Sequence, residues 1–283
     1  MRSRWIFKPI RTHYWRPKTD YLHAIWRAVK GIVKEGDIIV ISEKAISTAK
    51  GLIIDESKLK PTLSARLIAS FWMRVIWGYF LGYLCHLKPK SIQRLRAYPL
   101  SEGAKHKHLA LSYAGLLQAL RNGSEGGIDV SNLPYSYVSL PLPDPQKEAE
   151  GIRRFLESRG IKGVSIMIAD TDMTYTIGPL HLSPRRTSIP HIRGAALGFL
   201  TYLIGRMLKG KPRATPLALL GSDLSVEDAL TIAEAAHHLR GSGAGRTAWD
   251  ASERFSVKLA EVSWEMLDSI PHYPIVICRR LLY

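Results

Sequence analysis

Apolar and polar positions along the chain follow two periods, which predict helices and strands in turn. Apolar residues recur at helical spacing in three segments, which predicts helices at residues 20–33, 144–159 and 225–239. Thr19 or Asp20 would cap the first, and Pro145 would open the second. Continuous apolar runs predict buried strands at residues 38–41, 163–169 and 274–278. This order predicts the α/β class, as an α/β or mixed α+β fold.

One apolar stretch has the length of a membrane span. Residues 67–84 read LIASFWMRVIWGYFLGYL. Arg74 falls near the middle, where a charge in lipid is costly, and Gly78 and Gly82 interrupt the run. We therefore expect a buried or half-buried amphipathic helix and no membrane span. A dimer face or a peripheral membrane contact is the alternative.

Length and composition indicate the size of the fold and the cellular compartment. With 283 residues, 46% of them hydrophobic, the chain can bury a substantial core in one unit or two lobes. The two cysteines, Cys85 and Cys278, lie far apart, so we expect no disulfide framework and a reducing, cytoplasmic compartment. The basic start Met1-Arg2-Ser3-Arg4 precedes no apolar stretch with a cleavage site, so no signal peptide is expected.

The formal net charge of +16 limits the partners. Nucleic acid, an anionic membrane surface and small polyanions such as nucleotides are all compatible with it. The basic residues are spread along the chain, with small clusters at residues 88–96, 185–186 and 209–213. A general positive field is therefore favoured over a dedicated nucleic-acid arm.

A glycine pair followed by an acid is the sharpest local motif. The segment Gly126-Gly127-Ile128-Asp129-Val130-Ser131-Asn132 allows a tight turn and then presents a carboxylate and an amide three residues apart. The carboxylate suits Mg²⁺ or Mn²⁺, and the amide can bond a phosphate or a base. The alternative is an ordinary turn in which both side chains bond their own backbone.

A second acid follows a predicted strand. Asp170-Thr171 is expected where the strand at residues 163–169 opens into a loop, the usual ligand-binding end of an α/β sheet, and Asp172 adds a carboxylate. Together, Asp170 and Thr171 could ligate a divalent cation. A helix N-cap or turn aspartate is the alternative.

A glycine-rich loop ends the third predicted helix. Gly241-Ser242-Gly243-Ala244-Gly245-Arg246 could cradle a phosphate on exposed backbone N–H groups. It is not a Walker A loop, because no GK[ST] follows. His237-His238, just before it, is expected at a surface helix end rather than at a metal. HExxH, GxSxG and CxxC motifs are missing from the sequence.

Four stretches together resemble the coenzyme F420-0:L-glutamate ligase family, the F420 γ-glutamyl ligases, and they occur in the family's order. They are residues 36–51 (GDIIVIS and ISTAKG), 127–145 (GIDVSN and LPLPDP), 164–171 (the strand with Asp170-Thr171), and 229–279 (the alanine-rich helix, its glycine loop and PIVICR). The likeness spans nearly the whole chain.

The resemblance implies a two-lobed fold, with a ligand cleft and a second lobe formed by about residues 60–210. It implies a GTP-dependent ligase with Mg²⁺ or Mn²⁺, two cations being possible. Such an enzyme phosphorylates a carboxylate of coenzyme F420-0, and the amine of L-glutamate then displaces the phosphate. These anionic substrates fit the positive charge, and a homodimer is expected, with residues 71–80 as a possible interface.

The resemblance also assigns site residues. Asp129 and Asp170 would act in catalysis and, with Thr171, hold the metal. The nucleotide would be contacted by Asn132, Lys44, Thr48, Gly241 and Gly243.

Several positions depart from the family pattern. Thr48 stands at the family's lysine, for which Lys44 or Lys50 could substitute, and Ser242, after Arg240-Gly241, stands at its late metal-binding acid. His13-Tyr14-Trp15-Arg16 replaces an apolar, proline-containing loop, and Asp172-Met173-Thr174 replaces a small-Gly-Arg turn.

Three hypotheses about function follow from the sequence. The protein is a ligase, a divergent member that binds an anionic cofactor or nucleotide without this activity, or a nucleic-acid-binding protein.

Overall fold

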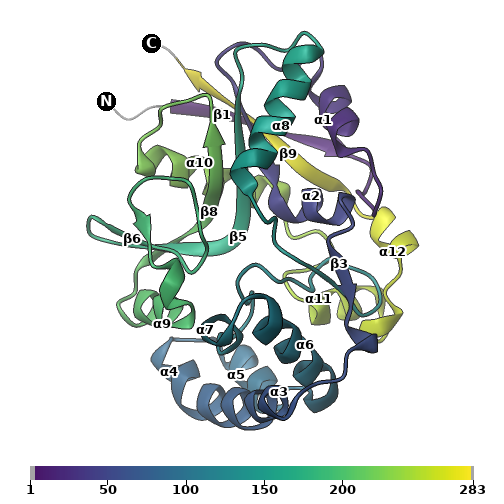
Figure 1. Cartoon of the computed structure of the whole chain (residues 1–283), viewed down its shortest axis with the longest axis vertical. Helices are drawn as coiled ribbons and strands as arrows, with labels where there is room; N and C mark the ends of the chain where they lie inside the picture. Colours follow the sequence, from purple (N-terminus) through teal and green to yellow (C-terminus); the bar gives the residue numbers. More distant parts are fainter. Residues whose placement is uncertain (1–3, 282–283) are drawn as a thin grey trace.

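Seven strands form the central sheet of the protein, whose structure, a computed structural model, describes residues 4–281 (Figure 1). The sheet order is β1 (Arg4–Thr12), β9 (His272–Leu281), β2 (Ile38–Ser42), β5 (Ser165–Ile177), β6 (Leu180–Leu182), β7 (Ile192–Arg193), with β8 (Lys211–Leu220) also pairing β5. The β2–β5 pair is parallel, whereas β9 pairs antiparallel with both β1 and β2. The expected mixed α/β class is confirmed. The basic start considered for a signal peptide lies, at residues 1–3, outside the described residues.

Helices cover both faces of this sheet. The helices α1 (Tyr21–Val29), α2 (Glu43–Ala49) and α8 (Pro145–Ser158) pack on one face, and α10 (Val226–Arg240) packs on the other. Successive residues of β2 point to opposite faces, so Ile39 and Ile41 join the first core and Ile38 and Val40 join the second. A strand that is buried on both faces must be apolar at every position, which explains the continuous apolar run at residues 38–41.

The strand at residues 163–169 continues further than predicted. β5 runs on to Ile177, because β8 keeps pairing it across a register shift between Asp170 and Met173. Its partner on the other side, β2, ends at Ser42 opposite Ala169. Asp170 and Thr171 therefore lie at a β-bulge within the strand, not in a loop after it.

Two long strands were missed by the pattern. β1 alternates exposed and half-buried residues, and β8 begins Lys211-Pro212-Arg213. Charged residues and prolines hide a strand from a search for apolar runs. A small second sheet pairs β3 (Ile53–Asp55) with β4 (Tyr137–Ser139).

A group of helices lies beyond one end of the sheet (Figure 1). Its members are α3 (Leu63–Leu67), η2 (Ile68–Leu81), α4 (Gly82–Leu84), α5 (Pro89–Arg96), α6 (Leu100–Tyr113) and α7 (Leu116–Ala119). Met73, Trp77 and Tyr98 belong to the core of this group, together with Cys85. Cys85 and Cys278 are both free and buried, as the sequence predicts. The division into two lobes stays a prediction.

The apolar stretch forms one continuous helix over residues 63–84, with η2 wound as a π-helix. By length and composition it could cross a membrane, and only 33% of its apolar window is buried within the protein, although one such helix is weak evidence for a span. Its indoles point inward: Trp72 and Trp77 each donate to the Leu120 carbonyl at 2.8 Å. The helix is therefore partly buried, and its exposed apolar side leaves a dimer face or a peripheral membrane contact as predictions.

The remaining elements complete the chain. They are η1 (Glu56–Lys58), η3 (Ala195–Leu197), α9 (Phe199–Met207), α11 (Ala248–Phe255), η4 (Leu259–Glu261) and α12 (Trp264–Asp268).

Candidate functional site

A cleft of about 790 Å³ gathers segments that are distant in the sequence. Its wall is formed by the end of β2 with α2, the loop at residues 121–132, the bulge of β5, and the loop that follows α10. All the predicted site residues line it: Lys44, Thr48, Asp129, Asn132, Asp170, Thr171, Gly241 and Gly243. The structure therefore brings together what the sequence could only place in separate motifs.

Asp129 is held at the cleft by its own turn and by α2. Its backbone pairs with Ser139 in both directions, at 3.1 and 3.0 Å. One carboxylate oxygen accepts from the Ser131 backbone N–H at 2.7 Å, and the other accepts from Lys44 Nζ at 2.7 Å. Lys44, a candidate substitute for the family's lysine, therefore does reach the cleft.

Asn132 anchors the glycine loop. Its side-chain oxygen accepts from the Ala244 N–H at 2.6 Å, and its amide nitrogen donates to the Gly245 and Ser242 carbonyls at 3.0 and 3.2 Å. Gly243 has φ +59°, and a Cβ there would lie 2.6 Å from the Asn132 oxygen. The amide that was expected to contact a nucleotide is thus occupied in positioning the loop.

Asp170 belongs to a buried triad with Arg185 and Glu43. Arg185 donates to one Asp170 oxygen and to both Glu43 oxygens, the latter at 2.8 and 3.0 Å. Burial raises the pKa of Asp170, an effect that Arg185 opposes and that the carboxylates of Asp172 and Asp129 reinforce. Burial likewise raises the pKa of Glu43 against the opposing charge of Arg185. Both Asp129 and Asp170 line the cleft, and Asp129 lies close enough to contribute to the raised pKa of Asp170.

Gly127 makes room for Arg185. Its φ is +97°, and a Cβ there would lie 2.0 Å from the Arg185 guanidinium. The glycine pair was interpreted as allowing a ligand to approach the backbone, but the group that approaches Gly127 belongs to the protein itself. The sequence flagged Arg185 only as part of a basic cluster.

Asp172 pairs with a cation of the neighbouring loop. Arg121 lies 2.5 Å from one of its oxygens, and both residues are buried. The second Asp172 oxygen has no hydrogen-bond partner among the described residues. Asp172 also lines the cleft, so a third carboxylate belongs to the wall that contains Asp129 and Asp170.

Thr48 and Lys50 differ in position. The Thr48 hydroxyl donates to the Lys44 carbonyl one turn back at 2.9 Å, although the residue lines the cleft. Lys50 binds Glu148 of α8 at 2.5 Å and does not line the cleft. Of the two candidate lysines, Lys44 is the one at the site.

The donor set at the cleft suits one divalent cation. Within residues 4–281, three or more His, Cys, Asp or Glu side chains do not gather into a ready metal cluster. Asp129, Asp170 and Thr171 are oxygen donors, however, and Mg²⁺ commonly takes one or two carboxylates and fills its shell with substrate phosphates and water. The residues present therefore fit a cation that arrives with a phosphorylated substrate.

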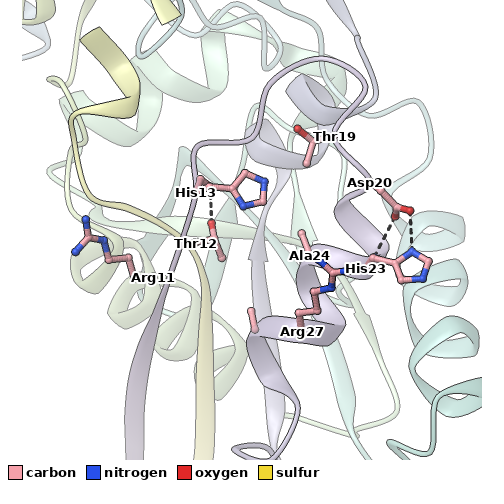
Figure 2. Close-up of a pocket in the computed structure, with 9 residues that line it drawn as sticks. Arg11, Thr12, His13, Thr19, Asp20, His23, Ala24 and Arg27 are labelled. Carbon is pink, nitrogen blue, oxygen red and sulfur yellow. Dashed lines mark hydrogen bonds and ion pairs between the residues drawn. The ribbon is translucent and has the colours of Figure 1, made fainter. Parts of the chain in front are cut away.

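A second hollow, of about 730 Å³, lies between β1 and α1 (Figure 2). Arg11, His13, His23 and Arg27 give it a basic lining, and its one acid, Asp20, bonds His23 at 2.7 Å. The predicted site residues are all elsewhere. This hollow is thus a basic surface feature without the paired acids of the cleft.

Comparisons with known proteins place the chain in a family. The family model described as "F420-0:Gamma-glutamyl ligase" matches residues 9–248. An uncharacterized protein of the archaeon Methanocaldococcus jannaschii is 36% identical over 225 residues, which covers 76% of this chain and 76% of that protein. The region that the family model matches, residues 9–248, includes every residue of the cleft named above.

Proposed function

We propose, from the premise that this chain belongs to the F420-0:γ-glutamyl ligase family, that its cleft is the active site of a nucleotide-dependent amide-forming ligase. Family membership supports a ligase in general. The finer proposal is that GTP and Mg²⁺ or Mn²⁺ drive formation of a γ-glutamyl amide between L-glutamate and coenzyme F420-0 or a related carboxylate. One observation carries it: Asp129 and Asp170, from distant motifs, line one cleft with Lys44 and the glycine loop.

The cleft offers what phosphoryl transfer to a carboxylate requires. Such a reaction depends on positioning and charge neutralisation more than on covalent protein chemistry. Lys44 supplies a cation beside Asp129, and the loop from Gly241 to Gly245 supplies backbone close to the same wall. The net charge of +16 favours the approach of anionic substrates.

Asp129, Asp170 and Thr171 would hold the cation. When bound, it would neutralise phosphate charge and polarise the phosphoryl group. Lys44 would have to release Asp129, or share it, for this to occur, because both oxygens of that carboxylate accept hydrogen bonds. A second cation, cytoplasmic location and a homodimer belong to the same proposal.

Turnover tests the proposal. Purified protein with GTP, Mn²⁺, coenzyme F420-0 and L-glutamate should yield GDP, phosphate and a glutamylated product. Asp129→Asn should lower kcat by at least about 100-fold, since it removes a charged group that acts on the reacting phosphate. Asp223→Asn, an exposed residue outside the cleft, is the matched control and should leave turnover unchanged. Absence of both turnover and nucleotide binding would remove the proposal.

The second candidate is a family member that binds an anionic cofactor or nucleotide without this reaction. Two observations favour it. Thr48 and Ser242 stand where the family has a lysine and a metal-binding acid, and Asp129 and Asp170 are both paired with cations of the protein. It predicts GTP binding that is insensitive to Mn²⁺. The third, nucleic-acid binding, rests on charge alone and predicts a steep loss of affinity for RNA or DNA with rising salt.

A further inference from the structure

The last residue of α10, Arg240, is half-buried, but both terminal nitrogens of its guanidinium are buried and lack an acceptor. Arg240 lines the cleft, yet both of its Nη atoms are closed off from water and make no hydrogen bond to any residue within the described range 4–281. Burial lowers the pKa of Arg240 to about 10, which leaves it charged at neutral pH. A charged donor that has lost water and gained no partner is costly, and charges in that position are normally paired.

The neighbours of Arg240 do not neutralise it. Asp170 acts on it electrostatically, but that carboxylate already accepts from Arg185. Glu234, six residues earlier in α10, bonds His238 at 2.8 Å and accepts from the Ala214 N–H at 2.6 Å. Asp170 and Glu234 are therefore both engaged with other donors.

Two imidazoles near Arg240 are neutral. Burial, followed by the charge of Arg240, lowers the pKa of His237 to about 4. Burial also lowers the pKa of His272 to about 4, with Arg240 among the contributing charges. At neutral pH both rings are thus uncharged, and the positive charge of this part of the cleft wall comes from arginines, among them the Arg240 and Arg246 that act on His237.

Space for a ligand lies next to Arg240. Gly241 has φ +71°, and nothing lies within 4 Å of the point that its Cβ would occupy. A ligand could approach the end of α10 there, where the following loop is held at its far side by Asn132.

We propose that Arg240 forms an oxyanion subsite in the cleft. It binds a phosphate or carboxylate group through both Nη atoms, the bidentate geometry for which a guanidinium is suited. The terminal phosphate of a nucleotide and the carboxylate of a substrate share this chemistry. The inference deepens the proposed ligase function and rests on it for the identity of the anion. A second protein cation, besides Lys44, would thereby neutralise charge in the cleft.

The test compares stability and anion binding in Arg240→Met, with Arg27→Met as the control that removes one exposed charge outside the cleft. Without ligand, Arg240→Met should raise Tm by about 2 °C or more, because an unsatisfied buried charge is removed. A merely structural arginine would give the opposite sign. In calorimetry, the variant should bind its oxyanion about 10- to 100-fold more weakly.

Separate arms identify the source of the oxyanion. Inorganic phosphate and GTP form one arm, and L-glutamate forms the other; a loss of affinity confined to one arm assigns the anion, and either assignment supports the subsite. Arg240→Lys keeps the charge but not the fork, and should bind with intermediate affinity, which covers a failure of Arg240→Met to fold. Equal affinities of wild type and both variants in both arms, or a wild type that binds neither probe, would overturn the inference. If the wild type shows no turnover but its anion binding still depends on Arg240, only the proposed ligase function is contradicted.

Discussion

At the scale of single residues, the cleft depends on close approaches that few side chains permit. Gly127 admits the Arg185 guanidinium, and Gly243 admits the Asn132 amide. Arg185 in turn joins Glu43 to Asp170. The position of Asp170 thus depends on Gly127 and Arg185, neither of which lines the cleft.

Gly127→Ala should destabilise the protein by at least about 3 kcal/mol and abolish turnover. The left-handed backbone costs an alanine about 1–2 kcal/mol, and displacing Arg185 leaves the buried Glu43 uncompensated, typically about 3–5 kcal/mol. Urea unfolding measures the loss. Gly160→Ala has a similar φ of +85° with open space around the new Cβ, so it should cost only the backbone strain. Equal losses in the two variants would show that Arg185 is not held by this approach.

At the scale of elements, much of the core could be predicted from the sequence. The apolar runs of β2, β5 and β9 and the periodicity of α1, α8 and α10 are properties of buried faces, so they are visible locally. The bulge at Asp170 was not predictable, because it arises where β2 ends and β8 continues. The roles of Arg185 and Arg121 were not predictable either, since both acquire their partners only through tertiary packing.

Helix α6 is tied to η1 and to the loop that leads into the cleft by a buried ion-pair cluster. His106 bonds Glu56 at 2.7 Å and Glu125 at 3.1 Å, and Lys107 bonds Glu125 at 2.5 Å. Burial opposes the charge of His106, but Glu125 and Glu56 outweigh it and raise the pKa of His106 to about 10. Burial opposes the charge of Glu125 as well, yet Lys107 and His106 lower its pKa.

The raised pKa predicts a loss of stability in alkali. An unfolded histidine titrates near about 6.5, so the stabilisation from His106 is complete below that pH and disappears as pH rises from about 6.5 to about 10. His106→Gln should therefore lose stability less steeply over this window than wild type, measured by urea unfolding at several pH values. His108→Gln, on the same helix outside the cluster, should follow the wild-type curve. Parallel curves for all three proteins would refute the pairing.

At the scale of the whole molecule, an apolar surface remains on the helix at residues 63–84. Phe71 and Phe80 are 55% and 63% exposed, whereas Trp72 and Trp77, also considered for an interface, are directed into the protein. Surfaces of this kind on soluble enzymes commonly mark interfaces. The homodimer predicted from the family resemblance would be built on this face.

Phe71→Ser with Phe80→Ser should convert a dimer into a monomer in size-exclusion chromatography with light scattering at high salt. Burial of these rings would stabilise the predicted dimer by about 1.5–3 kcal/mol for each ring. Leu208→Ser, which removes an exposed apolar residue beyond α9, should leave the dimer intact. A wild-type monomer would rule out this face as a dimer interface.

The whole account depends on a cleft whose acids bind a metal–nucleotide complex. Titration of GTP into the protein by calorimetry, with and without Mn²⁺, measures this directly. We predict tight binding that requires Mn²⁺ and that falls by about 10-fold or more in the Asp129→Asn, Asp170→Asn double variant, as expected for the loss of charged ligands. Binding that is equally tight without Mn²⁺, or unchanged in the double variant, would contradict the account.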